Sequence, residues 1–389
     1  MNAKLFDQTI NRLNTNSIKW DLYGQEVLPL WVADMDFPAP AAVIDALQNR
    51  LNHPVFGYQG HDEQLLEVIC AWVERRHGWR IDPAEILLVP GVVTGVNWVA
   101  RTFGKGGSGY LIQTPVYPPF FQAAANAGLR LIEAPLTESG GRYEIDFDAF
   151  ERCVALEKPE VFILCNPHNP VGRVFNRKEL ERLGEICLRH GVLICSDEIH
   201  CDLVYSGFHH LPIASLSEEL KNNTITLMAA SKTFNIPGLH FSFAIVPNAD
   251  LRKKMQSMGA GLIGHPEIFA CAAAKAAFTQ CDDWLADLLT YLEGNRDYLT
   301  SYLEREFPEI ICHPPEGTYL AWLDCRRLDL QPDAYRFFLE QARVALNDGL
   351  SFGSNGAGFV RLNFGCPRST LASALERMRQ ALDKTDRKG

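Results

Sequence analysis

The sequence predicts an α/β protein. A mostly parallel central sheet flanked by helices forms a large domain, and both chain termini contribute to a smaller α+β domain. Three observations predict this. Strand-sized apolar runs alternate with helical patterns through the middle of the chain. These runs are apolar at consecutive positions, as in strands that are covered on both faces. Near residue 285 the pattern changes to long helices with fewer strands.

The strands of the predicted sheet are short apolar runs in chain order. They read "EILLVP" from Glu85, "GYLIQTP" from Gly109, "VFILC" from Val161, "VLIC" from Val192 and "TITLMAA" from Thr224. Helical patterns separate them, beginning with "GVVTGVNWVART" after the first run. Strands that alternate with helices in this way favour parallel pairing.

One connection between strands shows helix signals at both ends. Asn176 has the position of an N-cap, and Glu179 follows three residues later as its capping-box partner. The segment "KELERLGEICLRH" then places apolar residues on one face, and Gly191 ends the helix. We therefore expect a strand–helix–strand crossover here.

The C-terminal part is predicted to form the smaller domain. A long helix is expected from about Asp283 to Phe307. The segments "GTYLAWLDC" and "GFVRLNFG" are typical of strands, with a helix between them and another at the end. The segment before Phe37 is too short to fold alone. We predict a large domain at 37–285 and a small domain from 1–36 and 286–389.

The composition excludes several classes of function. The 389 residues carry 37 Lys and Arg against 47 Asp and Glu, a net charge of -10. An acidic chain without basic clusters argues against nucleic acid or an anionic membrane as partner. The 11 cysteines are odd in number and show no Cys-x-x-Cys spacing, which indicates reduced thiols. No apolar run approaches a membrane span, and the N-terminus has no secretory pattern, so we expect a cytoplasmic protein.

Polar residues follow three of the predicted strands. Asn169 comes after "VFILC", Asp197 after "VLIC" and Lys232 after "TITLMAA", each about one crossover apart. In an open α/β sheet, ligands bind beyond the carboxyl ends of the strands. We therefore expect an amide, a carboxylate and an amine to lie at one edge of the sheet.

These residue types fit one cofactor. A desolvated lysine can condense with an aldehyde, and a carboxylate can hold a pyridinium proton. Asn169 suits a phenolate oxygen, and Tyr117 in "TPVYPPF" suits a ring face. The turn "PGVVTGV" opens a helix and offers backbone N–H groups to a phosphate. Together these groups describe a site for pyridoxal 5'-phosphate.

Each residue also has a simpler interpretation. Lysines after strands are common in solvated loops, aspartates there often cap helices, and "NPHNP" is compatible with a plain turn. Tyr117 is compatible with core packing. His200, His209 and His210 could suggest a metal site, but adjacent histidines point apart more often than they chelate, so we expect no metal.

The ordered motifs resemble a known family. The segments "NPHNPVG", "SDEIHCDLVY", "ASKTFNIPGL" and "FVRLNFG" are similar to fold-type-I pyridoxal-phosphate enzymes of the class I/II aminotransferase superfamily, over nearly the whole chain. The segments "PLWVADMDFPAP" and "VFGYQG" are similar to the cystathionine β-lyase-like C–S lyases within it. The resemblance implies an amino-acid substrate and a homodimer.

The resemblance also implies roles for single residues. Lys232 and Tyr117 are the catalytic candidates: Lys232 binds the cofactor aldehyde and moves the Cα proton, and Tyr117 stacks on the ring. Arg361 clamps the substrate α-carboxylate, with Asn169 beside it. The implied cofactor-binding residues are Lys232, Asp197, Asn169, Tyr117, Val92, Val93, Ser231, His200, His240 and, from the neighbouring subunit, Tyr58.

Four positions differ from the broad superfamily pattern. Val93 replaces a common hydroxyl residue, Ala229 a serine and His240 an arginine. These changes remove expected phosphate donors, and we expect His240 in cationic form to help hold the phosphate. His200 stands where tyrosine is common. His200 and His240 both accord with the C–S lyase subgroup.

The expected reaction is elimination. A cysteine S-conjugate such as L-cystathionine would yield pyruvate, ammonia and a thiol. Transamination needs the same lysine, aspartate and arginine, so it stays as the alternative. A regulatory protein that binds the cofactor without turnover is a third possibility, which the intact Lys232, Asp197 and Arg361 disfavour.

Overall fold

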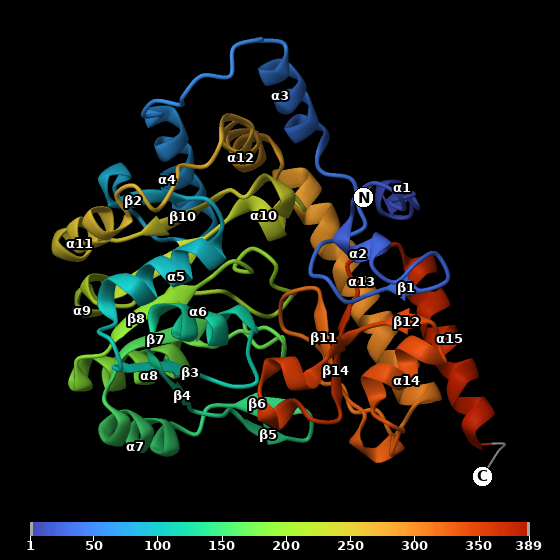
Figure 1. Cartoon of the computed structure of the whole chain (residues 1–389). Helices are drawn as coiled ribbons and strands as arrows, with labels where there is room; N and C mark the ends of the chain where they lie inside the picture. Colours follow the sequence, from blue (N-terminus) through green and yellow to red (C-terminus); the bar gives the residue numbers. More distant parts are fainter. Residues whose placement is uncertain (1–2, 387–389) are drawn as a thin grey trace.

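The computed structural model describes residues 3–386. A seven-stranded sheet in the order β2-β10-β9-β8-β7-β3-β4 occupies the left part of Figure 1. Only β10 runs antiparallel to its neighbours, and the other pairs are parallel, which confirms the predicted mostly parallel sheet. The strands are β2 (Ile86–Val89), β3 (Gly109–Ile112), β4 (Arg130–Glu133), β7 (Pro159–Cys165), β8 (Leu193–Asp197), β9 (Thr224–Met228) and β10 (Ser242–Ile245).

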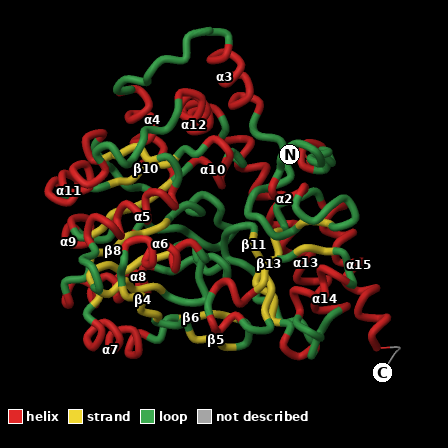
Figure 2. The backbone as a smooth tube through the Cα atoms, viewed as in Figure 1, coloured by secondary structure: helices red, strands yellow, loops and turns green. Residues whose placement is uncertain are grey.

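Strand β7 shows why the sheet is covered on both faces. Val161 and Ile163 pack with α5 (Val92–Phe103), α6 (Pro119–Ala127) and α11 (Ala249–Gly259). Phe162 and Leu164 point the other way and pack with α7 (Phe147–Glu157) and α8 (Arg177–His190). Because side chains alternate along a strand, both faces of β7 must be apolar. Figure 2 shows the strands of the sheet in yellow with red helices around them.

The predicted crossover between β7 and β8 is confirmed. The Asn176 side chain accepts a hydrogen bond from the Glu179 backbone N–H at 3.1 Å, and the Glu179 carboxylate accepts one from the Asn176 N–H at 2.8 Å. Gly191 ends α8 with a left-handed φ of 68°. The buried face of α8 comprises Leu180, Leu183, Gly184, Ile186 and Cys187.

The C-terminal part contains the predicted long helix and two strands. Helix α13 (Asp282–Glu306) precedes a three-stranded sheet of β11 (Leu320–Asp324), β14 (Phe359–Asn363) and β13 (Asn347–Asp348). Helix α14 (Ala334–Glu340) lies between these strands in sequence, and α15 (Arg368–Asp386) follows them. Strand β1 (Leu28–Pro29) pairs with β12 (Val344–Ala345), so the N-terminal segment joins this part.

The domain division itself stays a prediction. Its outermost residues, 1–2 and 387–389, lie outside the described part of the chain. Across residues 3–386, no helix combines the length and apolar character that crossing a membrane requires. The remaining elements are α1 (Ala3–Phe6), α2 (Ile18–Asp21), α3 (Ala41–Leu51), α4 (Glu63–His77), α9 (Glu218–Asn222), α10 (Ala230–Thr233), α12 (Ile268–Gln280), the hairpin β5 (Thr137–Ser139) and β6 (Arg142–Glu144), and 3₁₀ turns at Pro83–Glu85, Ile213–Ser215, Pro237–Leu239, Arg326–Leu328, Gly349–Phe352 and Ser354–Gly356.

Strand β10 and strand β4 were not expected from the sequence. Strand β10 has four residues, "SFAI", and follows β9 without a full crossover helix. It therefore lacks the strand–helix–strand pattern that identified the other strands. Strand β4 lies at the sheet edge, where only one of its four residues is buried, so its apolar signal is weak.

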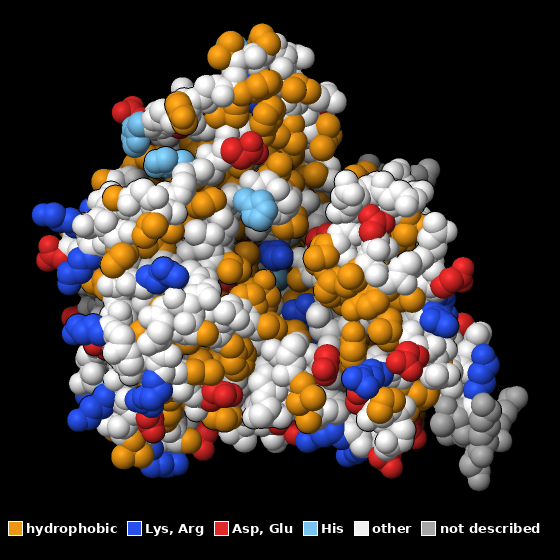
Figure 3. All heavy atoms as spheres, viewed as in Figure 1, with side chains coloured by type: hydrophobic (Ala, Val, Ile, Leu, Met, Phe, Trp, Pro, Cys, Tyr) orange, Lys and Arg blue, Asp and Glu red, His pale blue; other side chains and the backbone are white. Residues whose placement is uncertain are grey.

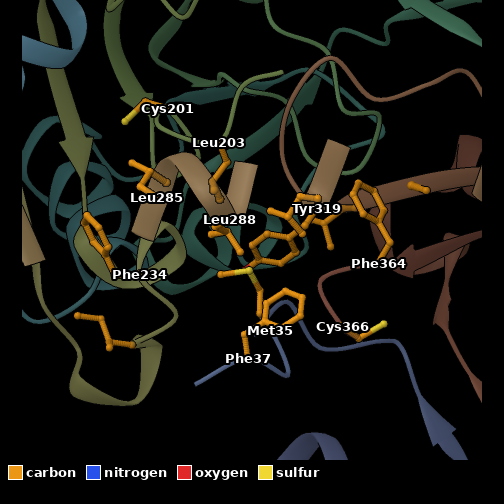
Figure 4. Packing of buried hydrophobic residues seen from close by; sticks show 14 of the residues in the cluster. Met35, Phe37, Cys201, Leu203, Phe234, Leu285, Leu288, Tyr319, Phe364 and Cys366 are labelled. Carbon is orange, nitrogen blue, oxygen red and sulfur yellow. The ribbon is translucent and has the colours of Figure 1, made fainter. Parts of the chain in front are cut away.

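The largest apolar cluster joins the N-terminal segment, α13 and the C-terminal sheet. Figure 4 shows part of it: Leu288 of α13 lies near Met35 and Tyr319. Leu288 has no exposed surface. This packing is what fixes the N-terminal segment against the rest of the molecule.

Replacing Leu288 with alanine should lower the free energy of unfolding by about 2–5 kcal/mol, because it leaves a cavity in this cluster. Urea denaturation of the cofactor-loaded protein measures the loss. Glu304→Ala, at an exposed position of the same helix, is the matched control and should change stability by less than about 0.5 kcal/mol. Equal effects of the two substitutions would contradict the packing described.

Candidate active site

The residues expected at the strand ends line one cavity of about 320 Å³. It lies beyond the carboxyl ends of β7, β8 and β9, at the start of α5. Figure 3 shows a hollow near the middle of this face with blue Lys or Arg atoms inside it. The lining residues are Ala33, Pro90, Gly91, Val92, Val93, Thr94, Tyr117, Cys165, Asn169, Asp197, Ile199, His200, Ser231, Lys232, Pro237, His240 and Phe241.

Lys232 lies on the short helix α10, directly after β9. Its Nζ donates a hydrogen bond to the Ala33 carbonyl at 2.7 Å. Burial lowers the pKa of Lys232 to about 8, while the carboxylates of Asp34 and Asp197 act in the raising direction and Arg361 in the lowering one. A neutral amine is therefore accessible near physiological pH, which is what condensation with an aldehyde requires.

Asp197 is the last residue of β8. Its Oδ1 accepts a hydrogen bond from the Ile199 N–H at 3.0 Å. Burial raises the pKa of Asp197 to about 7, because the carboxylate lacks a buried counter-charge strong enough to offset desolvation. A protonated pyridine nitrogen in the cavity would supply that positive charge.

Arg361 lies behind Asn169, on β14 of the C-terminal sheet. Its guanidinium donates to the Asn169 Oδ1 at 2.9 Å, to the Trp31 carbonyl at 2.9 Å and to the Asn347 Oδ1. Burial lowers the pKa of Arg361 to about 10. Its Nε is buried without a hydrogen-bond partner among the described residues. An unpaired buried donor is costly, so this atom is suited to an anionic ligand.

The Asn169 amide is oriented by this contact. Because its carbonyl oxygen accepts from Arg361, its NH₂ group is the part available to donate to a ligand in the cavity. Asn169 thus connects the cofactor side of the site with the guanidinium that is expected to bind the substrate carboxylate.

The turn before α5 is the predicted place for the phosphate. Gly91 has a left-handed φ of 95°, and a Cβ at this position would lie 3.7 Å from His240 Nδ1. The first N–H groups of α5, at Val92 and Val93, have no partner inside the helix and form a site for an anion. Ser231 and His240 line the same side of the cavity.

Tyr117 and His200 complete the lining. Tyr117 follows β3, and burial raises the pKa of its hydroxyl. His200 is buried, and its Nδ1 has no partner in the described part of the chain. Burial keeps the pKa of His200 far below its usual value, with Lys232 and Arg361 acting in the same direction, so the imidazole is neutral.

Two predicted site residues do not line this cavity: Arg361 lies directly behind Asn169, and Tyr58 lies away from the site altogether. Tyr58 is fully exposed, on the loop between α3 and α4. It lines a different hollow of about 490 Å³, next to a third one of about 610 Å³ near residues 59–62. Neither of these two larger hollows contains any other predicted site residue.

Several lining residues were not identified from the sequence. Cys165, Thr94 and Ile199 adjoin predicted residues, so their positions next to strand ends could have revealed them. Ala33 had no such signal, because it reaches the site from a segment about 200 positions away. Its contribution is a backbone carbonyl, which carries no residue-type signature.

One group of potential metal ligands occurs within the described residues: His77, Cys201 and Asp202, with ligand atoms within 4.8 Å of one another. The Asp202 carboxylate already accepts from Thr233 Oγ1 at 3.0 Å. It also lies 3.3 Å from His77 Nε2 and 3.5 Å from Arg76 Nε. Within the described residues, the Asp202 carboxylate therefore already has Thr233 and Arg76 as partners.

The cavity fits pyridoxal 5'-phosphate. The left-handed Gly91 keeps the start of α5 open to a phosphate. Lys232 and Asp197 line one cavity and can serve the aldehyde and the ring nitrogen. His200 Nδ1 and Arg361 Nε are buried without a hydrogen-bond partner among the described residues, so each is available to a polar group of a ligand. Each chemical group of the cofactor therefore has a matching protein group.

Lys232 in the cofactor-free protein should react with an acylating reagent with a midpoint near pH 8, because only the neutral amine is nucleophilic and burial lowers its pKa to about 8. Reactivity should be lost as the pH falls below this value. Peptide mass spectrometry across a pH series measures it, with the exposed Lys253 of α11 as internal reference. Identical profiles for the two lysines would contradict the assignment.

Comparisons with known proteins agree with this site. A family model described as "Aminotransferase class I and II" matches residues 25–378. "Cystathionine beta-lyase PatB" of Bacillus subtilis (strain 168) is 40% identical over 384 residues, 97% of this chain and 99% of that protein. "Protein MalY" of Escherichia coli (strain K12) is 34% identical, over 94% of this chain and 95% of that protein.

A solved structure is also similar. Cystalysin from Treponema denticola, which contains pyridoxal 5'-phosphate, has a TM-score of 0.95 and 36% identity, covering 98% of this chain and 99% of that chain. The fold, the cavity and the family together assign pyridoxal 5'-phosphate as the cofactor. The chain belongs to the aminotransferase class I and II family of pyridoxal-phosphate enzymes, within its PatB- and MalY-like C–S lyase group.

Proposed function

We propose that this protein is a C–S β-lyase that cleaves L-cystathionine or related cysteine S-conjugates to pyruvate, ammonia and a thiol. The observation that carries the proposal is the full-length similarity to a cystathionine β-lyase at 40% identity. The site supports it, since Lys232 and Asp197 line the same cavity and Arg361 lies directly behind Asn169.

The residues of the chain divide the reaction between them. Arg361 binds the substrate α-carboxylate, and Asp197 keeps the pyridine nitrogen protonated. When bound, the cofactor supplies an electron-withdrawing ring that stabilises charge at the substrate Cα. The neutral Lys232 amine removes the Cα proton, and Tyr117 holds the ring in place.

Bond changes at the substrate then follow. The electron pair from the Cα–H bond forms a Cα=Cβ bond, and the Cβ–S bond breaks with its electrons on sulfur. The Lys232 ammonium can return a proton to the departing thiolate. The aminoacrylate that is released hydrolyses to pyruvate and ammonia, so atoms and charge balance.

The pKa of Lys232 suits this double use. A group that must both accept and return a proton works best when its pKa lies near the working pH. Burial brings the pKa of Lys232 from 10.5 to about 8, which keeps both forms available. At lower pH the protonated form predominates, so the rate of proton removal should fall as the pH drops below 8.

Transamination is the second candidate, because it uses the same lysine, aspartate and arginine. Two features of the chain favour the lyase. His240 occupies the position where the broad superfamily commonly has arginine, and "WVADMDF" is similar to the C–S lyase subgroup. A cytoplasmic location accords with the cysteines, all of which are unpaired thiols within the described residues.

Purified enzyme loaded with cofactor should release pyruvate and one equivalent of thiol from L-cystathionine without an added keto acid. Pyruvate is measured with lactate dehydrogenase and the thiol with a chromogenic disulfide. Lys232→Ala should abolish both products, and Lys253→Ala, at an exposed site, should leave them unchanged. Turnover that requires a keto acid and releases no thiol would favour transamination, and full cofactor binding without any turnover would favour a regulatory role.

The proposal includes a homodimer in which Tyr58 reaches the phosphate of the neighbouring subunit. Tyr58 is fully exposed in the single chain, and Val55 and Phe56 beside it expose 63% and 57% of their surface. A loop that exposes three large apolar side chains within four residues is unfavourable in water and suits a contact with another chain.

Mixing two inactive variants should restore activity if Tyr58 acts across the dimer. Random exchange of Lys232→Ala with Tyr58→Ala subunits makes half of the dimers mixed, and each mixed dimer has one site with both residues intact. About one quarter of the sites should then be active. A mixture no more active than the mean of the separate variants would show that Tyr58 acts within its own subunit or not at all.

A further inference from the structure

The motif "LWVADMDF" forms a strap across the active site. We use "strap" for residues 30–37, which connect β1 with α3 (blue in Figure 1). Backbone carbonyls along it accept hydrogen bonds from side chains of distant elements. Asn363 of β14 donates to the Val32 and Asp34 carbonyls at 2.6 and 2.7 Å. Asn235 donates to the Met35 and Phe37 carbonyls at 2.9 and 2.7 Å.

Two further carbonyls of the strap contact the two cations of the site. The Trp31 carbonyl accepts from the Arg361 guanidinium at 2.9 Å. The Ala33 carbonyl accepts from Lys232 Nζ at 2.7 Å and from the Tyr319 hydroxyl at 2.8 Å. The position of the strap therefore decides where both cations lie.

Two cations outside the strap, Arg12 and Lys19, hold it through two of its own carboxylates, Asp34 and Asp36. We call Arg12, Lys19, Asp34 and Asp36 the ion cluster. Arg12 lies 2.7 Å from an Asp34 oxygen and 2.6 Å from an Asp36 oxygen. Lys19 Nζ lies 2.8 Å from Asp36 and 3.5 Å from Asp34, and also donates to the Asp34 carbonyl at 3.0 Å. Two cations and two anions make the cluster neutral.

The Lys19–Asp36 pair of the ion cluster is buried, whereas the Arg12 and Asp34 side chains expose 22% and 16% of their surface. Lys19 has no exposed surface, and the Asp36 side chain exposes 5%. The Trp20 Nε1–H donates to Asp36 at 2.8 Å. Buried charges are tolerated only when they are paired and hydrogen-bonded, so removing one member leaves another without a partner.

Apolar side chains anchor the strap from its other side. Met35 and Phe37 expose 1% and 4% of their surface. Figure 4 shows Met35 next to Tyr319 and Leu288. Gly365 lies so close that a Cβ there would be 2.7 Å from Met35 and 3.3 Å from Tyr319. The strap is therefore fixed by charges on one side and by core packing on the other.

We propose that Asp34 is a positioning residue for Lys232, and that the ion cluster acts through it by fixing the strap whose Ala33 carbonyl holds the Lys232 amine. This inference rests on the proposed catalytic role of Lys232. Asp34 combines two positions: its carboxylate belongs to the ion cluster, and its neighbour Ala33 contacts the amine. The motif "LWVADMDF", which forms the strap, thereby serves to position the Lys232 amine.

The charge of Asp34 points to the same role. The charged groups that face Lys232 are Asp34, Asp197 and Arg361. Burial lowers the pKa of the amine, and Asp34 is the charge that opposes this most strongly, ahead of Asp197. The uncharged polar groups nearby are His200, Tyr319 and Tyr117. Asp34 thus prevents burial from making the amine too weak a base to take up the Cα proton.

The test uses two substitutions with opposite expected signs. Asp34→Asn removes the negative charge at nearly constant shape, so the pH midpoint of Lys232 acylation in the cofactor-free protein should fall by about 1 unit, and labelling at low pH should rise about tenfold. Arg12→Gln removes the cation that partly neutralises Asp34, so the midpoint should rise. A merely structural role would shift both variants in the same direction or not at all.

Further variants separate the effect of the position of the Asp34 side chain from the effect of its charge. Asp34→Glu keeps the charge and should restore the midpoint toward the wild-type value. In the cofactor-loaded enzyme, Asp34→Asn should lower kcat and move its acid limb to lower pH, with a smaller effect on KM. An unchanged acylation midpoint in Asp34→Asn would overturn the proposal. If that variant does not fold, an unchanged or lowered midpoint in Arg12→Gln would overturn it.

The labelling result does not depend on the overall reaction. If the wild-type enzyme transaminates and the midpoints still shift in opposite directions, the proposed lyase function fails and the role of Asp34 stands. If the enzyme releases thiol from L-cystathionine and the midpoints do not move, the function stands and the role of Asp34 fails.

Discussion

The reaction proposed for this protein depends on the Lys232 amine, which is removed from water without being left unpaired. Lys232 lies on α10, just beyond the end of β9, where burial weakens it as a base. Three features of its surroundings limit that loss: the hydrogen bond to the Ala33 carbonyl and the carboxylates of Asp34 and Asp197. Burial and negative charge act in opposite directions, and their balance gives an amine that can both lose and regain a proton near neutral pH.

The site is built from segments that are far apart in the chain. The sheet brings Asn169, Asp197 and Lys232 together at its carboxyl edge, which is the usual ligand position of such sheets. The C-terminal sheet supplies Arg361, and the N-terminal strap contacts both cations. An apolar cluster that includes α13 holds these parts in register. Stability of this cluster and geometry of the site are therefore linked.

Much of the central sheet could be predicted from local patterns. The crossover from β7 to β8 was recognisable because the capping box at Asn176, the apolar face of α8 and the left-handed Gly191 are encoded within a few residues. Lys232, Asp197 and Asn169 were identified because each directly follows a strand-like run. Strand β10 was missed because an antiparallel neighbour needs no crossover helix.

The amino-acid sequence by itself determined five of the seven strands of the central sheet, the crossover from β7 to β8 and the residue types that meet at the carboxyl edge, because apolar runs and helix caps are short-range signals. The tertiary structure alone decided that the Ala33 and Trp31 carbonyls hold the two cations of the site and that Arg12, Lys19, Asp34 and Asp36 form one cluster. Those contacts join segments far apart in the chain. The acceptors in these contacts are often backbone atoms, which every residue has, so the residue types do not predict the contacts.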